Sequence, residues 1–297
     1  MLSIHYCSPR FVTEDELVDN FGFRQGHARK LLYHLRQARS SADVEVAVNS
    51  AKAQGAHAMI KLMVSRPFEL QLQREVAEGI LEIIMQAPKD SFSSFANYRQ
   101  VRTHAYSNCS ANARCQQFID AGGVRAAVQM LETAVEDGPT VFRGVQVVNL
   151  FIFQIYSKGE EGAEILRQTA CIGPLVSVLK RWYEDTLLLT YCCNSLVGLA
   201  YGDNMLRTEI ARLGGILPIV NALEAKRGDE DAVRWALTML RNVAIYDENK
   251  IAIGKANGIE LVLGVLRQKH LQKNLAVCEG AFGVLWNSSS GNGRWRA

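Results

Sequence analysis

Two groups of residues in this sequence have types that could bind a metal or act as acid and base. His104, Cys109 and Cys115 form the one cluster of histidine and cysteine, the side chains that bind zinc. Structural zinc sites usually place two ligands roughly two to four residues apart, which this cluster does not do. Glu78 and Glu82 would share a helix face with a third glutamate, but carboxylates at helical spacing are more often a solvated surface.

A third segment, residues 253–258, is similar to a phosphate-binding loop. In such a loop, backbone amides and a lysine hold the phosphates of a nucleotide. Asn249 stands where the first glycine should be, and Ala256 replaces the serine or threonine that binds Mg²⁺. No Gly-x-Ser-x-Gly or His-Glu-x-x-His motif occurs either. We therefore expect no catalytic residue, no metal, no cofactor and no enzymatic activity.

Length and composition exclude further classes of protein. The 297 residues are more than one compact core usually holds, so the chain is either two domains or an extended repeat array. A net charge of +3 is too small to indicate a nucleic-acid or membrane partner. No apolar run approaches the ~18 residues of a membrane span. The 7 cysteines are odd in number and scattered, which is typical of reduced thiols. We expect a cytoplasmic protein, with the nucleus as the alternative.

A recurring segment organises the sequence from residue 54 onward. Each copy contains a glycine followed by apolar residues at helical spacing. The aligned glycines are Gly55, Gly123, Gly173, Gly215 and Gly258, at steps of 68, 50, 42 and 43 residues. Glycine allows a sharp turn between two helices, where a side chain would clash or need a left-handed backbone. A helix therefore begins at each of these turns.

A second, longer helix follows each glycine segment. The predicted long helices are residues 71–85, 141–156, 187–201, 231–245 and 274–288. The register of the second is open by one residue. In the last, the pattern predicts a buried face of Ala281, Phe282, Leu285 and Ser288. A short helix behind a polar turn precedes the glycine, so the unit is a short helix, a turn, a helix and a long helix.

This unit resembles the armadillo repeat. The segment Glu-Asn-Lys-x-x-Ile from residue 248, the Gly-Ile at residue 258 and the endings at residues 236–244 and 284–288 are close to the consensus of that family. The resemblance covers roughly residues 54–297. It implies an all-α fold, a right-handed α-solenoid of about five armadillo repeats, with residues 1–53 as an irregular helical cap or degenerate repeat.

Two departures from the repeat are informative. The longest step contains an insertion near residues 86–107, which is either a plain surface loop or a docking loop. Residues 291–297 align with the polar turn that opens a further repeat. We expect the last repeat to expose an apolar face, to be covered by Trp295, or to be covered by a partner.

In armadillo proteins that bind peptides, an asparagine near the end of each long helix hydrogen-bonds the ligand backbone. A tryptophan often lies four residues earlier. The resemblance places the asparagine position at Glu82, Gln154 (or Phe153), Gly198, Asn242 and Asn287. The preceding position holds Glu78, Leu150 (or Asn149), Asn194, Thr238 and Gly283. Because the asparagine occurs only in the last two repeats and the tryptophan in none, a nuclear-import receptor of the importin-α kind is disfavoured.

The resemblance implies a groove in which a peptide or helix of a protein partner binds. Its candidate residues are acidic at the first end, polar and aromatic in the centre, and basic or amide-bearing at the far end. They are Glu78, Glu82, Gln154, Tyr191, Asn194, Arg234, Trp235, Thr238, Arg241, Asn242 and Asn287. Trp235 stands where the family usually has a polar surface residue. It is either an aromatic anchor for a ligand or a packing residue against a neighbouring repeat.

The predicted function is a non-enzymatic scaffold or adaptor that binds a partner protein in this groove. The alternative is a structural subunit of a cytoskeletal or ciliary assembly. In that case the last repeat and the 86–107 insertion would make the contacts.

Overall fold

The computed structural model describes residues 41–86, 109–200 and 203–290, and every element in these ranges is a helix. The chain separates into two units, Met1–Ser50 and Ala51–Ala297. In the first unit, residues 41–50 are described, and they belong to a helix over residues 41–54. The 86–107 insertion, except for its first residue, and Trp295 lie outside the described residues.

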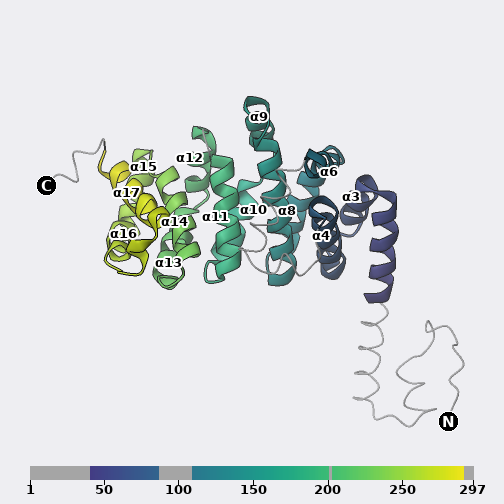
Figure 1. The fold of residues 1–297 in the computed structure, drawn as a ribbon, viewed down its shortest axis with the longest axis horizontal. Coiled ribbons are helices and arrows are strands. Elements are labelled where there is room, and N and C mark those ends of the chain that lie inside the picture. Colours follow the sequence, from purple (N-terminus) through teal and green to yellow (C-terminus); the bar gives the residue numbers. More distant parts are fainter. Residues whose placement is uncertain (1–40, 87–108, 201–202, 291–297) are drawn as a thin grey trace, which may run out of the picture. The chain divides into compact units, whose positions relative to one another are not determined.

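The second unit repeats one arrangement of helices (Figure 1). The short helices are α6 (Cys109–Asp120), α9 (Glu160–Gln168), α12 (Asn204–Arg212) and α15 (Asp247–Lys255). The middle helices are α3 (Ala56–Ser65), α7 (Gly123–Thr133), α10 (Ile172–Trp182), α13 (Ile216–Ala225) and α16 (Gly258–Leu266). The long helices are α4 (Leu70–Met85), α8 (Gly138–Tyr156), α11 (Thr186–Ala200), α14 (Glu230–Val243) and α17 (Leu275–Ser289), the last of which follows the 3₁₀ turn η2 (Leu271–Lys273). The predicted all-α solenoid is confirmed.

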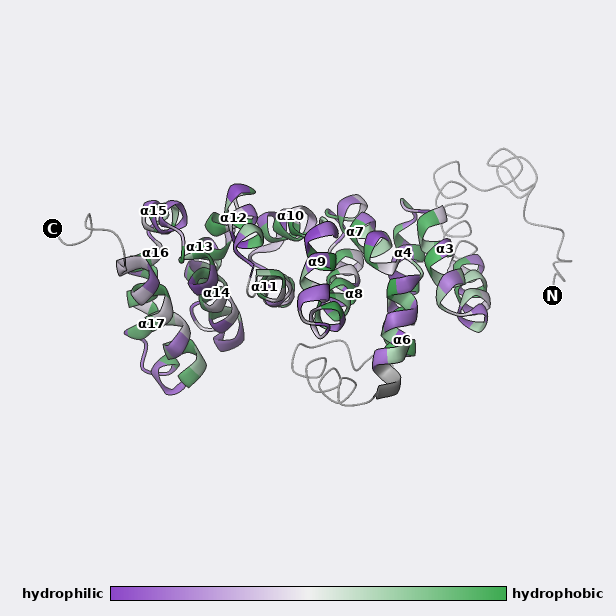
Figure 2. Ribbon diagram, turned by 90° about the horizontal axis from the view of Figure 1, so that it is seen from above, coloured by the Kyte–Doolittle hydropathy of each residue, from purple (hydrophilic) through white to green (hydrophobic). Residues whose placement is uncertain are grey.

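The long and middle helices form two layers of this unit. Seen from above, α8, α11, α14 and α17 lie on one side, and α7, α10, α13 and α16 lie on the other (Figure 2). Each long helix packs against the next long helix and against the middle helix of its own repeat. The apolar core fills the space between the layers, with Ile80, Val148 and Leu240 fully buried.

Four of the long helices begin at an acidic or amide residue. The side-chain oxygens of Asp137, Asp185, Asp229 and Asn274 accept hydrogen bonds from backbone N–H groups of the first turn. Such N-caps satisfy amides that have no partner within the helix. The ends of the predicted long helices agree with the observed ones to within three residues, although the sequence interpretation did not use these caps.

The prediction of a glycine turn at Gly173 is wrong, because Gly173 lies inside α10 and Ala170 has the left-handed backbone before that helix. Other predicted turns use two adjacent residues rather than one. Between α12 and α13, Gly214 adopts a left-handed backbone with φ of 78°. The aligned Gly215 has an ordinary φ, but a Cβ there would lie 2.9 Å from the carbonyl oxygen of Ile210. The Gly215 amide donates to that same oxygen at 2.9 Å, as in a Schellman motif. Gly214 is thus required for the left-handed backbone. Gly215 is required because a side chain there would clash with the carbonyl group of Ile210.

One prediction about the core is wrong. The sequence pattern placed Phe282 on the buried face of the last long helix, but its side chain is 61% exposed. Val277, Ala281 and Val284 form the buried face of α17 instead. The reason is that no described helix follows α17, so the side that inner repeats cover is open.

Within the described ranges, no helix combines the length and hydrophobicity needed to cross a membrane.

Candidate functional site

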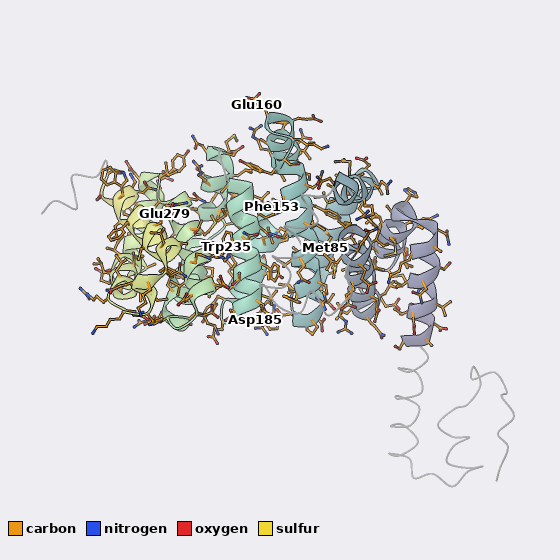
Figure 3. All side chains as sticks on the ribbon, viewed as in Figure 1. Met85, Phe153, Glu160, Asp185, Trp235 and Glu279 are labelled. Carbon is orange, nitrogen blue, oxygen red and sulfur yellow. The ribbon has the colours of Figure 1, made fainter. Side chains whose placement is uncertain are left out.

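The predicted binding residues all lie on the long helices, and their surroundings divide them into two sets. Figure 3 looks onto the long helices and marks Phe153 on α8, Trp235 on α14 and Glu279 on α17. In the first set, the residues on α4 and α11 contact neighbouring helices. Gln154 on α8 is buried, and its Oε1 has no hydrogen-bond partner among the described residues. The second set, on α14 and α17, is half-exposed.

The two acidic residues of the first set are held in ion pairs. Arg143 Nε lies 3.0 Å from Glu78 Oε1, and both side chains are largely buried. Lys52 Nζ lies 2.8 Å from Glu82 Oε2. The two carboxylates therefore meet cations supplied by the fold itself, and the predicted acidic end of the groove is neutralised.

Tyr191 is fully buried between α8 and α11. Its hydroxyl accepts a hydrogen bond from Gln146 Nε2 at 3.0 Å, and Gln146 Oε1 accepts one from Arg143 at 3.0 Å. The ring of Phe142 meets the Tyr191 ring edge to face, with 5.5 Å between the ring centroids. Such an aromatic pair adds about 0.5–1.5 kcal/mol beyond the area it buries. Tyr191 thus joins two long helices.

Asn194 has a similar role one turn further along α11. Asn149 Nδ2 donates to Asn194 Oδ1 at 2.8 Å and to Ser195 Oγ at 2.9 Å, and all three residues are buried. At the open register position, Gln154 is buried and Phe153 is half-exposed, so Phe153 is the residue that reaches the surface. The binding roles predicted for Tyr191, Asn194 and Gln154 stay predictions.

The second set forms what we call the α14–α17 surface. It consists of Arg234, Trp235, Thr238, Arg241, Asn242 and Asn287, which are all half-exposed. The guanidinium carbon of Arg234 lies 4.6 Å from the centre of the Trp235 ring, a cation–π contact. Trp235 therefore presents an aromatic face beside a cation.

Hydrogen bonds within the α14–α17 surface leave one amide side chain unengaged. Asn287 Nδ2 donates to the backbone carbonyl of Arg241 at 2.9 Å. Arg241 in turn lies 3.0 Å from Glu279, which is mostly exposed. Thr238 donates to the carbonyl of Arg234 at 2.8 Å. In contrast, the Asn242 side chain makes no hydrogen bond with any residue of the described part of the chain.

The residues considered for phosphate binding and metal binding have structural roles in the fold. Residues 253–258, the segment similar to a phosphate loop, end α15 and begin α16. Of the possible metal cluster, His104 and the side chain of Cys109 lie outside the described residues. Burial raises the pKa of the Cys115 thiol to about 12. In the ranges that the structure describes, no group of three metal-binding side chains comes together.

The described cysteines are free, and all but Cys278 are buried. Burial raises the pKa of Cys171 to about 11 and the pKa of both Cys192 and Cys193 above its ordinary value. A thiol of this kind stays protonated at neutral pH and is a poor nucleophile. This supports the expectation that these cysteines pack in the core.

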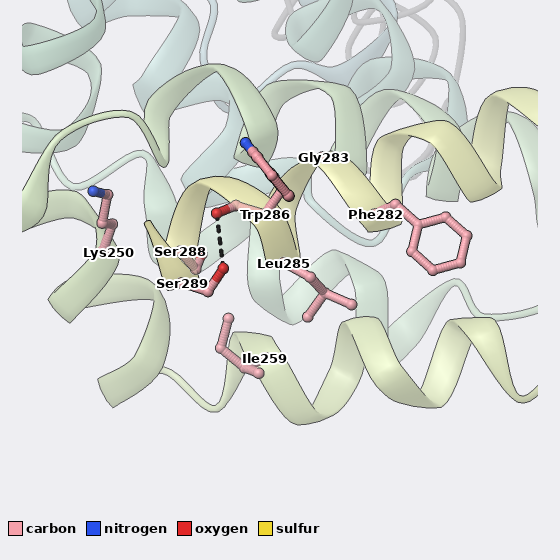
Figure 4. Close-up of a pocket in the computed structure, with 8 residues that line it drawn as sticks. All are labelled: Lys250, Ile259, Phe282, Gly283, Leu285, Trp286, Ser288 and Ser289. Atoms are coloured by element: carbon pink, nitrogen blue, oxygen red, sulfur yellow. Dashed lines mark hydrogen bonds between the residues drawn. The ribbon is translucent and has the colours of Figure 1, made fainter. Parts of the chain in front are cut away.

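The structure also places a cleft that the sequence interpretation did not find. It has a volume of about 740 Å³ and lies along α17, bordered by α15 and α16 (Figure 4). Its lining residues are Lys250, Ile259, Phe282, Gly283, Leu285, Trp286, Ser288 and Ser289. Periodicity alone assigned Phe282 to the core. The expectation that the last repeat exposes an apolar face agrees with the exposure of Phe282 and Trp286.

Sequence comparison finds short matches to catenins. No family model matches the chain. Over 96 residues, the chain is 38% identical to human catenin delta-2, and 34% identical to the juxtamembrane domain-associated catenin of Caenorhabditis elegans. Each match covers 31% of this chain and 7% of the catenin. The chain therefore matches only a small part of the length of these relatives.

Structural comparison extends over most of the chain. A designed armadillo repeat protein has a TM-score of 0.55 at 17% identity, covering 80% of this chain and 84% of the designed one. An engineered protein has a TM-score of 0.56 at 20% identity, covering 85% of both chains. At these identities the similarity concerns the fold.

Proposed function

We propose that this chain, which is an array of armadillo repeats, acts as a non-enzymatic scaffold that binds an extended segment of a partner protein. The binding site is the α14–α17 surface. The observation that carries this proposal is that the polar and aromatic residues from Trp235 to Asn287, on α14 and α17, are half-exposed. The candidate polar residues on α8 and α11 are buried. Stacked repeats expose such faces as extended binding surfaces.

The chemistry of the α14–α17 surface suits a peptide backbone with an apolar side chain. The amide of Asn242 can donate to a peptide carbonyl and accept from a peptide N–H at the same time. Trp235 offers a large ring of low conformational entropy, the type of residue that dominates binding energy at interfaces. The cation of Arg234 over that ring holds the ring in place and adds polar contact.

The α4–α8–α11 part contributes less to such a site. The carboxylates of Glu78 and Glu82 lie in ion pairs, and Tyr191 and Asn194 hydrogen-bond across α8 and α11. A ligand could use these groups only by breaking internal bonds. We therefore place the ligand over the last two repeats.

A peptide-display screen tests this proposal. A library of disordered protein segments is panned on the full chain, and the selected peptides are synthesised for fluorescence polarisation. Loss of one neutral hydrogen bond costs about 1 kcal/mol, so Asn242→Ala should weaken binding roughly fivefold to tenfold. Removing an aromatic anchor costs about 2 kcal/mol or more, so Trp235→Ala should weaken it at least about thirtyfold.

Arg212→Ala is the matched control, since among the described residues this exposed residue of α12 pairs only with Glu209 of its own helix. It should leave peptide affinity unchanged. Peptides that bind equally well to the Asn242 and Trp235 variants would refute the placement of the site. A screen that yields no specific peptide would refute the proposal as a whole.

A second candidate function is a structural subunit of a larger cytoskeletal or ciliary assembly. The open side of α17, with Phe282 and Trp286 exposed, favours it. The 86–107 insertion, which this alternative also uses, lies outside the described residues. A chain that is insoluble alone and becomes soluble with a partner on α17 would favour this role over the scaffold.

We further propose an intracellular location, in the cytoplasm or the nucleus, for either function. Free, buried cysteines support it, because secreted domains commonly pair their cysteines. The absence of enzymatic activity is likewise proposed from the raised thiol pKa values and from the structural roles of the candidate residues.

A further inference from the structure

The short helix α9 packs differently from the other short helices that the structure describes. Helices α6, α12 and α15 each contact the middle helix of the preceding repeat, which is α3, α10 and α13 respectively. The corresponding contact between α9 and α7 is weaker than any of these, whereas α9 contacts α8 more extensively than α12 contacts α11. Figure 1 shows α9 at the top of the array, beyond the ends of α6 and α12.

Two features of the sequence explain the position of α9. Helix α8 has 19 residues, compared with 15 in α11 and 14 in α14. All three begin after an aspartate cap, so the additional turn lies at the C-terminal end of α8. Gly162 of α9 lies against this turn, because an added Cβ would overlap the carbonyl oxygen of Ile155. Helix α9 therefore approaches α8 closely and leaves part of α7 uncovered.

A groove of about 750 Å³ lies between α7 and α9. We call it the α7–α9 groove and define it by six of its lining residues, which are Val124, Arg125, Val128, Gln129 and Glu132 of α7 and Ile165 of α9. Described helices of the array lie on both sides of it, so the groove does not depend on what precedes or follows this sequence. Clefts of this size are typical of binding sites.

The α7–α9 groove combines apolar surface with one charge of each sign. Val128 is buried, and Val124 and Ile165 are half-exposed. Arg125 and Glu132 are exposed, and neither forms an ion pair with another residue of the described ranges. Their spacing of seven residues places them about 10 Å apart along the axis of α7. The groove therefore selects a ligand by its charge pattern as well as by its apolar surface.

The next repeat indicates what kind of ligand fills such a position. In α12, Leu206 is buried, and Leu213 Cδ1 lies 4.0 Å from a Cβ added to Gly173 of α10. Helix α9 has Gly162 and Thr169 at the positions of these two leucines. The apolar side chains that α12 supplies to α10 are thus missing over α7, and a helix from another molecule can supply them.

We propose that the α7–α9 groove binds a short amphipathic helix of another protein. Apolar side chains of this helix contact Val124 and Val128, a carboxylate faces Arg125 and a cation faces Glu132. The groove shares no residue with the α14–α17 surface, and α7 lies in the opposite layer of the array (Figure 2). The chain then binds two protein segments on opposite sides, and each of the two sites is tested separately.

Two synthetic peptides, each stapled into a helix on the face away from the groove, test the charge pattern. The first has Glu and Lys seven positions apart with two leucines between them, and the second has Lys at both charged positions. The staple lowers the entropic cost of ordering the peptide. In isothermal calorimetry with the full chain we expect saturable binding. The mixed peptide should bind at least about fivefold more tightly, because the second peptide replaces one ion pair with a repulsion at Arg125.

Arg125→Glu should reverse this preference. It makes both charges of the groove negative, so the peptide with two lysines should bind at least about fivefold more tightly than the mixed one. Arg227→Glu is the matched control, since it makes the same change in net charge at an exposed arginine between α13 and α14. It should keep the preference of the unmodified chain.

Gln129→Trp tests the shape of the groove. The larger side chain fills the space between α7 and α9 and should weaken the mixed peptide at least about tenfold. Ser177→Trp places the same residue at the matching position of α10, outside the groove, and should leave the affinity unchanged. Gln129 is half-exposed and Ser177 is exposed, so circular dichroism should show that both variants melt at the temperature of the unmodified chain.

Four results would overturn the proposal. They are no saturable binding, a peptide preference that Arg125→Glu does not change, unweakened binding to Gln129→Trp, and a loss of binding in Trp235→Ala, which would place the probe on the α14–α17 surface. Sedimentation showing a dimer that Gln129→Trp dissociates would identify a second copy as the occupant instead. Because Trp235→Ala should leave this probe unaffected, failure here is distinguishable from failure of the scaffold proposal.

Discussion

Buried polar side chains of α8 hydrogen-bond to those of α11, whereas the polar side chains of the α14–α17 surface are half-exposed. Tyr191 and Asn194 accept hydrogen bonds from Gln146 and Asn149 of the neighbouring helix and are buried. On α14, by contrast, Asn242 is half-exposed and has no hydrogen bond to another described residue. The same repeat therefore joins helices through its polar side chains in one region and leaves such side chains half-exposed in the other.

The difference shows how one repeat can separate stability from binding. A buried polar network specifies one arrangement of its helices, but only when every member has a partner. A half-exposed amide without a partner in the protein costs little free energy, because water forms hydrogen bonds with it. The amide therefore stays available to a ligand. We infer that the α8–α11 pair holds the array together and that the α14–α17 pair is the part that binds.

The largest expected effect contrasts two aromatic residues. Tyr191→Ala removes a fully buried ring and should lower the free energy of unfolding by about 3–5 kcal/mol. Trp235→Ala removes a ring that is only partly buried and should lower it by less, about 2–3 kcal/mol. Urea denaturation followed by circular dichroism measures both changes.

Tyr191→Phe separates the hydroxyl from the ring. It keeps the ring, removes the hydroxyl that accepts from Gln146 and should cost about 1–2 kcal/mol. If the Tyr191 and Trp235 alanine variants are equally unstable, the two regions do not differ as described.

A smaller effect contrasts two asparagines. Asn149→Ala deprives Asn194 and Ser195 of their shared donor inside the fold and should cost about 2–3 kcal/mol. Asn242→Ala should change the free energy of unfolding by less than about 0.5 kcal/mol, because water replaces any contact it makes. Thermal melting of both variants beside the unmodified chain checks this, and a reversed order would contradict the comparison.

The arrangement of the repeats was predictable from sequence, since it rests on local chemistry. Apolar spacing at 3.6 residues locates each helix, and glycine marks most of the turns, although Ala170 has the left-handed backbone before α10 and Asn257 has it before α16. The pair Gly214 and Gly215 shows the limit of this approach. Sequence indicates that the turn needs glycine, but only coordinates show which residue is left-handed and which one approaches a carbonyl closely.

The surroundings of the candidate binding residues were not predictable in the same way. Tyr191 and Trp235 are both aromatic residues on long helices, and periodicity does not distinguish them. Their difference depends on what the preceding helix offers, here Gln146 and Phe142 facing Tyr191. Phe282 was assigned to the core because it has the same position in its repeat as Leu237. Whether a further helix packs on that side of α17 depends on the array and cannot be read from the helix itself.

The pH dependence of stability provides the smallest test, through a thiol buried in α11. Burial raises the pKa of Cys193 above its ordinary value of 9.0. In the unfolded chain this thiol releases its proton near pH 9, whereas the folded chain retains it to higher pH. Unfolding then releases a proton, so stability is complete below about pH 9 and falls as pH rises further, by about 1 kcal/mol per pH unit for each such thiol.

Cys193→Ala removes one thiol from this linkage. Its free energy of unfolding should therefore fall less steeply between about pH 9 and pH 10.5 than that of the unmodified chain, whatever the variant costs at pH 7. Asn242→Ala changes no titratable group in α14 and should keep the full slope. Urea titrations at a series of pH values measure the slopes. If Cys193→Ala keeps the full slope as well, the thiol is not protected by burial, and the core around α11 is looser than its burial indicates.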